Sequence, residues 1–255
     1  MHAIVKSRTA RQVLFGLGCV CGLAGLFAMQ SAGSAEPAPR LQVGTLPVGK
    51  ILFLGNSITL HGPAANIGWT GNWGMAASAK EKDYVHRLLD RINKKAGGTP
   101  QVMVRNIAEF ERNLTDYSVP DSLKDELAFE ADVVILAIGE NAMPPETEAA
   151  RERFATALRG LLAEIRRHGH PTIIVRSQFW PDAVKDGLLK QECATAGGIF
   201  VDIKPLGTDP ANAAKAERDI EHAGVAAHPG DKGMDAIAEA LWKALQQAGT
   251  KPAQP

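Results

Sequence analysis

The sequence alternates between short apolar runs and longer segments in which apolar residues recur every three or four positions. The short runs are rich in Val, Ile, Leu and Ala, which is typical of strands buried on both faces of a sheet. The longer segments have the periodicity of helices with one apolar face. The predicted strands are residues 50–54, 101–106, 131–138, 172–176 and 199–202. The predicted helices are residues 81–96, 121–129, 146–168, 182–196 and 231–247.

The order of these segments predicts the fold class. Strands that alternate with helices favour a parallel sheet covered by helices on both faces, which is an α/β domain. Periodicity alone does not give the order of the strands within the sheet. We expect one domain over residues 50–247, preceded by a proline-containing linker over residues 36–49 and followed by a frayed polar tail over residues 248–255.

Residues 1–35 are typical of a secretory signal peptide. Basic side chains precede an apolar run over residues 13–29, and small residues follow that run up to Ala35. This pattern predicts cleavage near Ala35 and a secreted or periplasmic protein with no stable membrane insertion. One alternative is an uncleaved membrane anchor, for which the apolar run is short. Another is a lipoprotein at Cys19 or Cys21, although glycine stands where a lipobox has a large aliphatic residue.

Charge and cysteine content exclude several classes of function. The 28 basic and 28 acidic residues cancel, so no bulk charge would attract nucleic acid. Cys193 is the only cysteine beyond the predicted signal peptide, which excludes an internal disulfide in the mature chain. The histidines are scattered, and the sequence has neither a His-Glu-x-x-His helix nor a cysteine pair. We therefore expect no metal site and no cofactor.

Small and polar residues follow two of the predicted strands and precede the last predicted helix. Gly55-Asn56-Ser57 follows the first strand, Gly139-Glu140-Asn141 follows the third, and His228 precedes the final helix. Taken singly, each has a simpler explanation as a helix cap, a turn former or a helix-entry residue. The carboxyl ends of parallel strands meet at one edge of a sheet, however, so we expect these side chains to converge. A serine needs a base such as histidine, and an asparagine amide can stabilise an oxyanion. The constellation predicts a serine hydrolase.

These motifs resemble the sequence blocks of the SGNH, or GDSL-like, hydrolases over nearly the whole chain beyond residue 50. Gly55-Asn56-Ser57-Ile58-Thr59 resembles the first block, with Asn56 in place of the usual aspartate. Gly139-Glu140-Asn141 resembles the third block, and His228-Pro229 with Gly233 resembles the fifth. The Gly-x-Ser-x-Gly elbow of α/β-hydrolases is absent around Ser57.

The resemblance implies a fold and a set of roles. The fold would be a three-layer α/β/α sandwich of flavodoxin-like type around a five-stranded parallel sheet. Ser57 would be the nucleophile, and its backbone N–H would be one oxyanion donor. Asn141 would supply a second donor. His228 would act first as general base and then as general acid.

The sequence departs from the family pattern at two places. The family has an aspartate three residues before the histidine, and this position is Val225 here. Either a backbone carbonyl orients His228 in a Ser–His dyad, or another acid does so, the candidates being Glu111, Glu221 and Asp231. The second-block glycine is also missing from residues 106–111, which contain glutamates that would repel an oxyanion. Either these side chains turn away, or one of them orients His228 or binds substrate.

Three further residues are candidates for substrate binding. Trp69 and Trp73 lie in a long glycine-rich loop after Ser57, where they could form a wall suited to sugar rings or could pin the loop to the core. Arg176 follows the fourth strand, where it could bind an anionic or carbonyl group. Pairing of Arg176 with a carboxylate such as Glu111 is the favoured alternative.

The sequence thus predicts an exported serine esterase that removes a small acyl group, in the first instance acetyl, from a carbohydrate or cell-envelope glycan. Its partner would be a small-molecule or glycan ester. An O-acyltransferase that uses the same serine is one alternative. A non-catalytic glycan-binding protein of the same fold is another, and Val225 together with the missing glycine supports it.

Overall fold

The computed structural model describes residues 41–250. The predicted signal peptide, the first part of the predicted linker and residues 251–255 lie outside this range.

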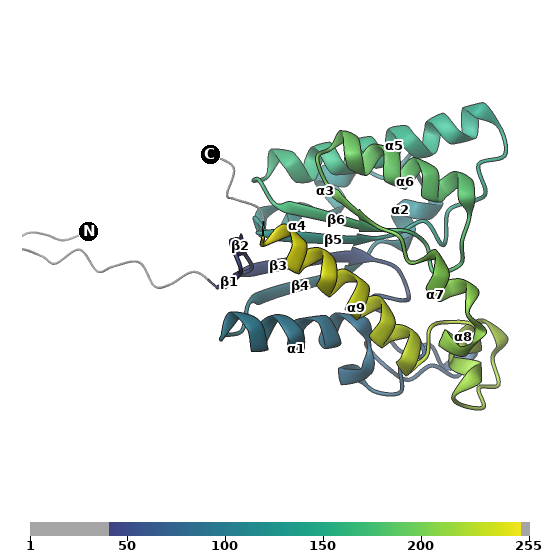
Figure 1. Ribbon diagram of the computed structural model, residues 1–255. Coiled ribbons are helices and arrows are strands. Elements are labelled where there is room, and N and C mark those ends of the chain that lie inside the picture. Colours follow the sequence, from purple (N-terminus) through teal and green to yellow (C-terminus); the bar gives the residue numbers. More distant parts are fainter. Residues whose placement is uncertain (1–40, 251–255) are drawn as a thin grey trace, which may run out of the picture. The chain divides into compact units, whose positions relative to one another are not determined.

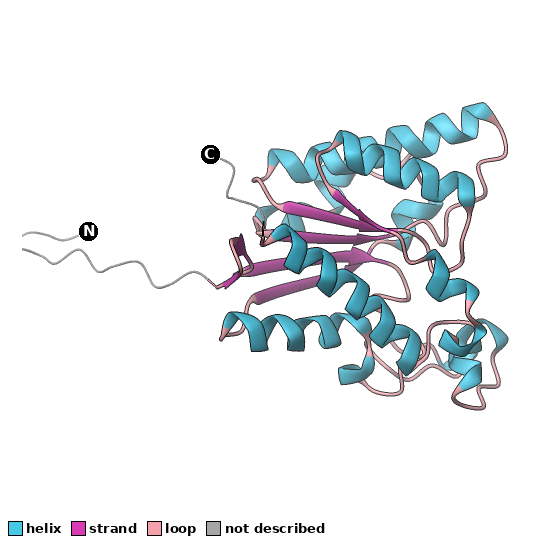
Figure 2. Ribbon diagram, in the orientation of Figure 1, coloured by secondary structure: helices cyan, strands magenta, loops and turns pink. Residues whose placement is uncertain are grey.

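Within the described residues, the middle layer is a five-stranded parallel sheet (Figure 1, Figure 2). The strand order is β4-β3-β5-β6-β7, so the first sheet strand in the chain lies between the second and the third. All five predicted strands are confirmed, with ends that shift by at most two residues. They are β3 (Lys50–Gly55), β4 (Gln101–Asn106), β5 (Val133–Ala137), β6 (Thr172–Arg176) and β7 (Ile199–Val201).

Helices cover both faces of the sheet (Figure 1). The α1 helix (Tyr84–Ala96) and the α9 helix (Asp231–Ala248) pack on one face, whereas α5 (Glu148–Arg167) and α6 (Ala183–Thr195) pack on the other. Alternate strand residues point to opposite faces, so Phe53 contributes to the first apolar cluster and its neighbours to the second. The α/β/α sandwich predicted from the sequence is therefore confirmed.

The remaining elements are short and gather mainly in the loops between strands and long helices. The predicted helix over residues 121–129 is in fact two short helices, α3 (Val119–Ser122) and α4 (Lys124–Ala128), which are separated at Leu123. The short α-helices are α2 (Ala108–Arg112), α3 (Val119–Ser122), α4 (Lys124–Ala128), α7 (Lys204–Thr208) and α8 (Ala223–Ala226). The 3₁₀ turns are η1 (Ala65–Ile67), η2 (Lys80–Lys82), η3 (Pro210–Asn212) and η4 (Ala214–Ala216).

The domain begins earlier and ends later than the sequence indicates. Strands β1 (Gln42–Val43) and β2 (Leu46–Pro47) form an antiparallel pair inside the segment expected to be a linker. Val43 in β1 is buried in the main apolar cluster. The backbone N–H of Thr45, between the two strands, donates to the Gly249 carbonyl at 2.8 Å, so the start and end of the domain are tied together.

Candidate active site

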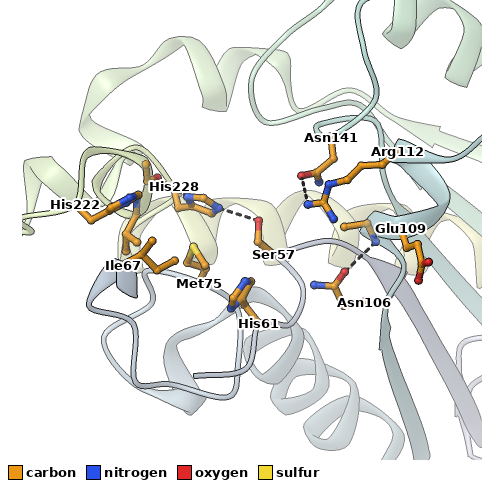
Figure 3. Close-up of a pocket in the computed structure, with 13 residues that line it drawn as sticks. Ser57, His61, Ile67, Met75, Asn106, Glu109, Arg112, Asn141, His222 and His228 are labelled. Atoms are coloured by element: carbon orange, nitrogen blue, oxygen red, sulfur yellow. Dashed lines mark hydrogen bonds between the residues drawn. The ribbon is translucent and has the colours of Figure 1, made fainter. Parts of the chain in front are cut away.

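Ser57 follows β3 at the carboxyl edge of the sheet. The turn into it is tight, because a Cβ atom on Gly55 would lie 1.9 Å from the Thr59 Oγ1 atom. The Ser57 Oγ atom lies 2.8 Å from the Nε2 atom of His228, which is 171 residues further along the chain (Figure 3). This is the distance of a good hydrogen bond and the reach that proton transfer requires.

A main-chain carbonyl orients the His228 ring. The residue lies between α8 and α9, and its Nδ1 atom is 2.7 Å from the carbonyl oxygen of Gly224. A carbonyl only accepts, so Nδ1 carries the proton and Nε2 offers its lone pair to Ser57. Trp180 packs edge-on against the imidazole, with ring centroids 4.9 Å apart. The ring thus has the tautomer and the orientation that a general base needs.

The surroundings of His228 also favour its neutral form. Burial lowers the pKa of the imidazole below its usual value of 6.5, and this effect outweighs the opposing influence of the Gly224 hydrogen bond. A neutral imidazole at pH 7 can accept the hydroxyl proton of Ser57.

None of the three candidate acids contacts His228. Asp231 accepts hydrogen bonds from the backbone N–H and hydroxyl of Ser78, and Glu221 is exposed on the segment before α8. Glu111 is buried below the nucleophile, where it has other partners. Of the partners that the sequence leaves open for the His228 ring, the structure has the backbone carbonyl.

A buried polar network lies beneath Ser57. The Asn56 side chain donates from Nδ2 to Glu111 Oε1 at 3.0 Å and to Glu140 Oε2 at 2.7 Å. Glu140 also forms an ion pair with Arg176 at 2.6 Å and accepts a hydrogen bond from the Phe179 N–H at 3.0 Å. The Arg176 side chain is fully buried, so it is a structural counter-ion, and it does not reach the pocket that holds Ser57.

The two glutamates of this network have opposite pKa shifts. Burial alone would raise the pKa of Glu140, but the charge of Arg176 and the hydrogen bonds to this carboxylate lower it overall. Glu111 has no cation of its own. Burial, followed by repulsion from Glu140, raises the pKa of Glu111 to about 7. The network therefore holds one carboxylate that stays ionised at neutral pH, Glu140, and one that titrates near neutrality, Glu111.

Glu111 and Lys185 hold the loop that carries Asn141. The Asn141 backbone N–H donates to Glu111 Oε2 at 2.6 Å, and its Nδ2 atom donates to the same oxygen at 3.3 Å. The buried Nζ of Lys185 donates to the carbonyls of Gly139 and Ala142 at 2.9 and 3.0 Å. Gly139 has a φ of +118°, which disfavours any residue with a Cβ. The loop conformation is therefore tightly specified.

Two donors remain for an oxyanion. An amide group has two N–H hydrogens, so Asn141 can direct its second one towards the pocket that it lines. The Ser57 backbone N–H donates to no protein group within residues 41–250. Ser57 and Asn141 line the same pocket, so both N–H groups are candidates for stabilising an oxyanion that forms there.

The glutamates in place of the missing glycine do not face the nucleophile. The Ala108 N–H at this position donates to the Asn106 Oδ1 atom at 2.9 Å. Glu109 borders the pocket, but its carboxylate is directed away from Ser57 (Figure 3). Glu111 holds Asn141 instead of orienting His228. Neither carboxylate would oppose an oxyanion directly.

The pocket at Ser57 has a volume of about 470 Å³. It borders a second hollow of about 850 Å³, and Ile67, His222 and Gly224 line both. The second hollow runs between residues 65–68 and 219–224. Together they leave room for a substrate larger than a simple acetyl ester.

Of the two roles that the sequence leaves open for Trp69 and Trp73, the contacts of the structure match the one in which they pin the loop. Trp69 and Trp73 pack edge to face with ring centroids 5.6 Å apart, and neither lines the pocket at Ser57. Their indole N–H groups donate to the carbonyls of His61 and Ala77, both at 3.0 Å. Both rings therefore pin the loop after Ser57, which is the structural alternative.

The sequence reasoning missed several residues of the site. His61, His222 and Arg112 line the pocket, and no motif marks them. Glu140 and Lys185 had no assigned role. A signal existed for Glu140, since a carboxylate directly after a wholly apolar strand must be buried and must find a partner.

No group of three or more His, Cys, Asp or Glu side chains within residues 41–250 is arranged to hold a metal ion.

Comparison with known proteins shows which solved structures have a similar fold. No protein-family model matches the sequence, and no curated protein matches it. Among solved structures, a protein described as a GDSL-like lipase from Bacteroides uniformis ATCC 8492 matches with a TM-score of 0.51 at 14% identity, over 79% of this chain and 97% of the other. A similarly described protein from Bacteroides ovatus ATCC 8483 matches with a TM-score of 0.50 at 12% identity, over 78% and 99% of the two chains. The chain has the α/β fold of these GDSL-like proteins. At such identities the likeness shows the fold alone, so the activity must be argued from the site.

Proposed function

We propose that this SGNH-fold protein is an exported serine esterase that removes a small acyl group, in the first instance acetyl, from a carbohydrate. The observation that carries the proposal is the 2.8 Å separation of Ser57 Oγ and His228 Nε2, with Nδ1 fixed by the Gly224 carbonyl. A serine and a neutral histidine in this geometry form an activated nucleophile.

The reaction follows from the geometry. His228 takes the Ser57 proton while Oγ attacks the acyl carbonyl, and the Ser57 N–H and Asn141 amide stabilise the oxyanion. The imidazolium then gives its proton to the leaving sugar oxygen as the ester bond breaks. Water enters with His228 as base, attacks the acyl-enzyme and releases the acid together with free Ser57.

The absence of a carboxylate behind His228 shapes the energetics. The imidazolium that forms during attack is stabilised by the dipole of the Gly224 carbonyl and has no anionic partner among residues 41–250. We therefore expect this dyad to stabilise the imidazolium less than the aspartate of a Ser-His-Asp triad does.

Separate observations support the substrate class and the location. The hollow that adjoins the Ser57 pocket is lined mainly by polar groups, which suit a hydroxylated substrate better than a long acyl chain. Export is supported by the signal-like pattern of residues 1–35. None of the helices in the described part of the chain combines the length and hydropathy of a membrane span.

A fluorophosphonate probe tests the proposal. We expect it to label Ser57, and we expect Ser57→Ala to lose both the label and turnover of p-nitrophenyl acetate. A folded wild-type protein that is neither labelled nor active would favour the glycan-binding alternative. Acyl transfer to an added sugar with little hydrolysis would favour the acyltransferase.

A further inference from the structure

Arg112 places a cationic group in the pocket that holds Ser57. It is the last residue of α2, and its guanidinium points into the pocket beside Asn141 (Figure 3). Its Nη2 atom donates to the Asn141 Oδ1 atom at 3.0 Å. No carboxylate within residues 41–250 forms an ion pair with it. A guanidinium has five N–H donors in a planar fork, so most of its hydrogen-bonding capacity faces the pocket unused.

The other ionisable groups that line the pocket do not neutralise this charge. Glu109 is the one acid among them, and its carboxylate is directed away from Ser57 (Figure 3). The rest are His61, His222 and His228, which bring no negative charge. A ligand with a carboxylate would therefore meet an attractive field at the Arg112 end of the pocket.

The hydrogen bond to Asn141 does not by itself explain why the Arg112 guanidinium lies in the pocket. Two hydrogen bonds to Glu111 already fix the backbone N–H and the amide of Asn141, and Lys185 fixes the carbonyls on either side. Arg112 is exposed, and hydrogen bonds from exposed arginines add little to a group that is already held. A bond to Asn141 instead aims the guanidinium at the space that a bound substrate would fill.

We propose that Arg112 binds a carboxylate of the substrate, so that the preferred esters are acylated acidic carbohydrates such as acetylated uronosides. This inference rests on the proposed esterase function and adds the substrate class. The carboxylate would pair with the free edge of the guanidinium through two charge-assisted N–H···O bonds. The sugar would then present its ester to Ser57 from a fixed side of the pocket.

The first test compares two substrates that differ in one group: acetylated methyl glucuronoside and acetylated methyl glucoside. We expect wild type to favour the glucuronoside in kcat/KM, and Arg112→Gln to lower that preference ratio about 10- to 100-fold. Arg112→Lys should keep part of the preference, because the charge remains. Arg153→Gln, which removes an exposed arginine of α5 outside this pocket, should leave the ratio as in wild type. Using the ratio cancels any common loss that arises through Asn141.

An equal loss on both esters would overturn the proposal, because Arg112 would then act only through Asn141. Measurable turnover of both esters by wild type with equal kcat/KM would also overturn it.

A binding measurement separates this proposal from the esterase proposal. Calorimetry on Ser57→Ala should show tighter binding of methyl glucuronoside than of methyl glucoside, and adding Arg112→Gln should abolish the difference. If wild type hydrolyses neither ester but this difference holds, the esterase proposal fails and the carboxylate site stands. Equal binding of the two glycosides would overturn the site whatever the turnover.

Discussion

The two halves of the candidate site are built in contrasting ways. Below Ser57 and Asn141, the proposed nucleophile and oxyanion donor, lie buried ions: Glu140 with its counter-ion Arg176, Glu111, and Lys185 on the loop carbonyls. Behind His228, the proposed general base, there is a single main-chain carbonyl, that of Gly224. Buried charge is costly to remove and therefore rigidifies what it touches, whereas a neutral dipole orients a group with little added charge. The chain thus fixes the loop of Asn141 with buried charged groups and orients His228 with a neutral dipole.

The largest expected effect tests whether the two halves act as one unit. Ser57→Ala and His228→Ala should each lower kcat/KM for p-nitrophenyl acetate roughly 10³- to 10⁶-fold, because either loss removes the activated nucleophile. The double variant should lose little beyond either single one. Multiplicative losses in the double variant would mean that Ser57 and His228 act separately, in spite of their 2.8 Å contact.

Breaking the ion pair should show how much the nucleophile half depends on buried charge. Glu140→Gln leaves the Arg176 cation, whose side chain is 0% exposed, without its partner. We expect the free energy of unfolding in urea to fall by about 3–5 kcal/mol. Glu152→Gln, at an exposed glutamate of α5, should change it by less than about 0.5 kcal/mol. Similar small losses in both variants would contradict the structural role of the pair.

Glu111 links the buried ions to catalysis. In Glu111→Gln the replacement amide faces three N–H donors with only one acceptor oxygen, so Asn141 should lose its fixed position. We expect kcat to fall about 10- to 100-fold with little change in KM, because the oxyanion exists only in the transition state. Glu152→Gln again serves as the control. A rise in KM with kcat unchanged would instead place Glu111 in substrate binding.

The smallest effect concerns the histidine half. Burial disfavours the imidazolium, so the pKa of His228 should lie below the usual value of 6.5. The ring should be neutral at any pH above that lowered pKa. Base catalysis should accordingly be lost as pH falls through that lowered pKa. The NMR titration of the ring proton, assigned by its absence in His228→Ala, measures this pKa apart from that of Glu111. A value above 6.5 would imply an anionic partner that the contrast between the halves excludes.

Local patterns predicted the strands well, because a fully buried parallel strand is marked by its own apolar run. They failed where long-range contacts determine the local structure. Strands β1 and β2 form against the end of α9, and residues 121–129 divide into two short helices. The strand order needed the structure as well, since no local signal states which strand neighbours which.

Sequence motifs identified the site residues that lie within them, but they gave no indication of the site residues that lie between them. Ser57, Asn141 and His228 follow or precede regular elements, so their convergence could be foreseen from the sheet edge that they share. The sequence marks Glu111 as a candidate to orient His228, pair with Arg176 or bind substrate. It holds Asn141 instead, because sequence spacing cannot show which way a side chain turns. Arg112 carries no signal of its own, since its role depends on a pocket formed by distant segments.

The carbonyl behind His228 has a practical consequence for mapping this machinery. Side-chain replacement leaves the peptide oxygen of Gly224 in place, so an alanine scan would not report the group that orients His228. Detecting that group requires backbone chemistry, for example exchange of the amide linkage after Gly224 for an ester, which weakens the oxygen as an acceptor.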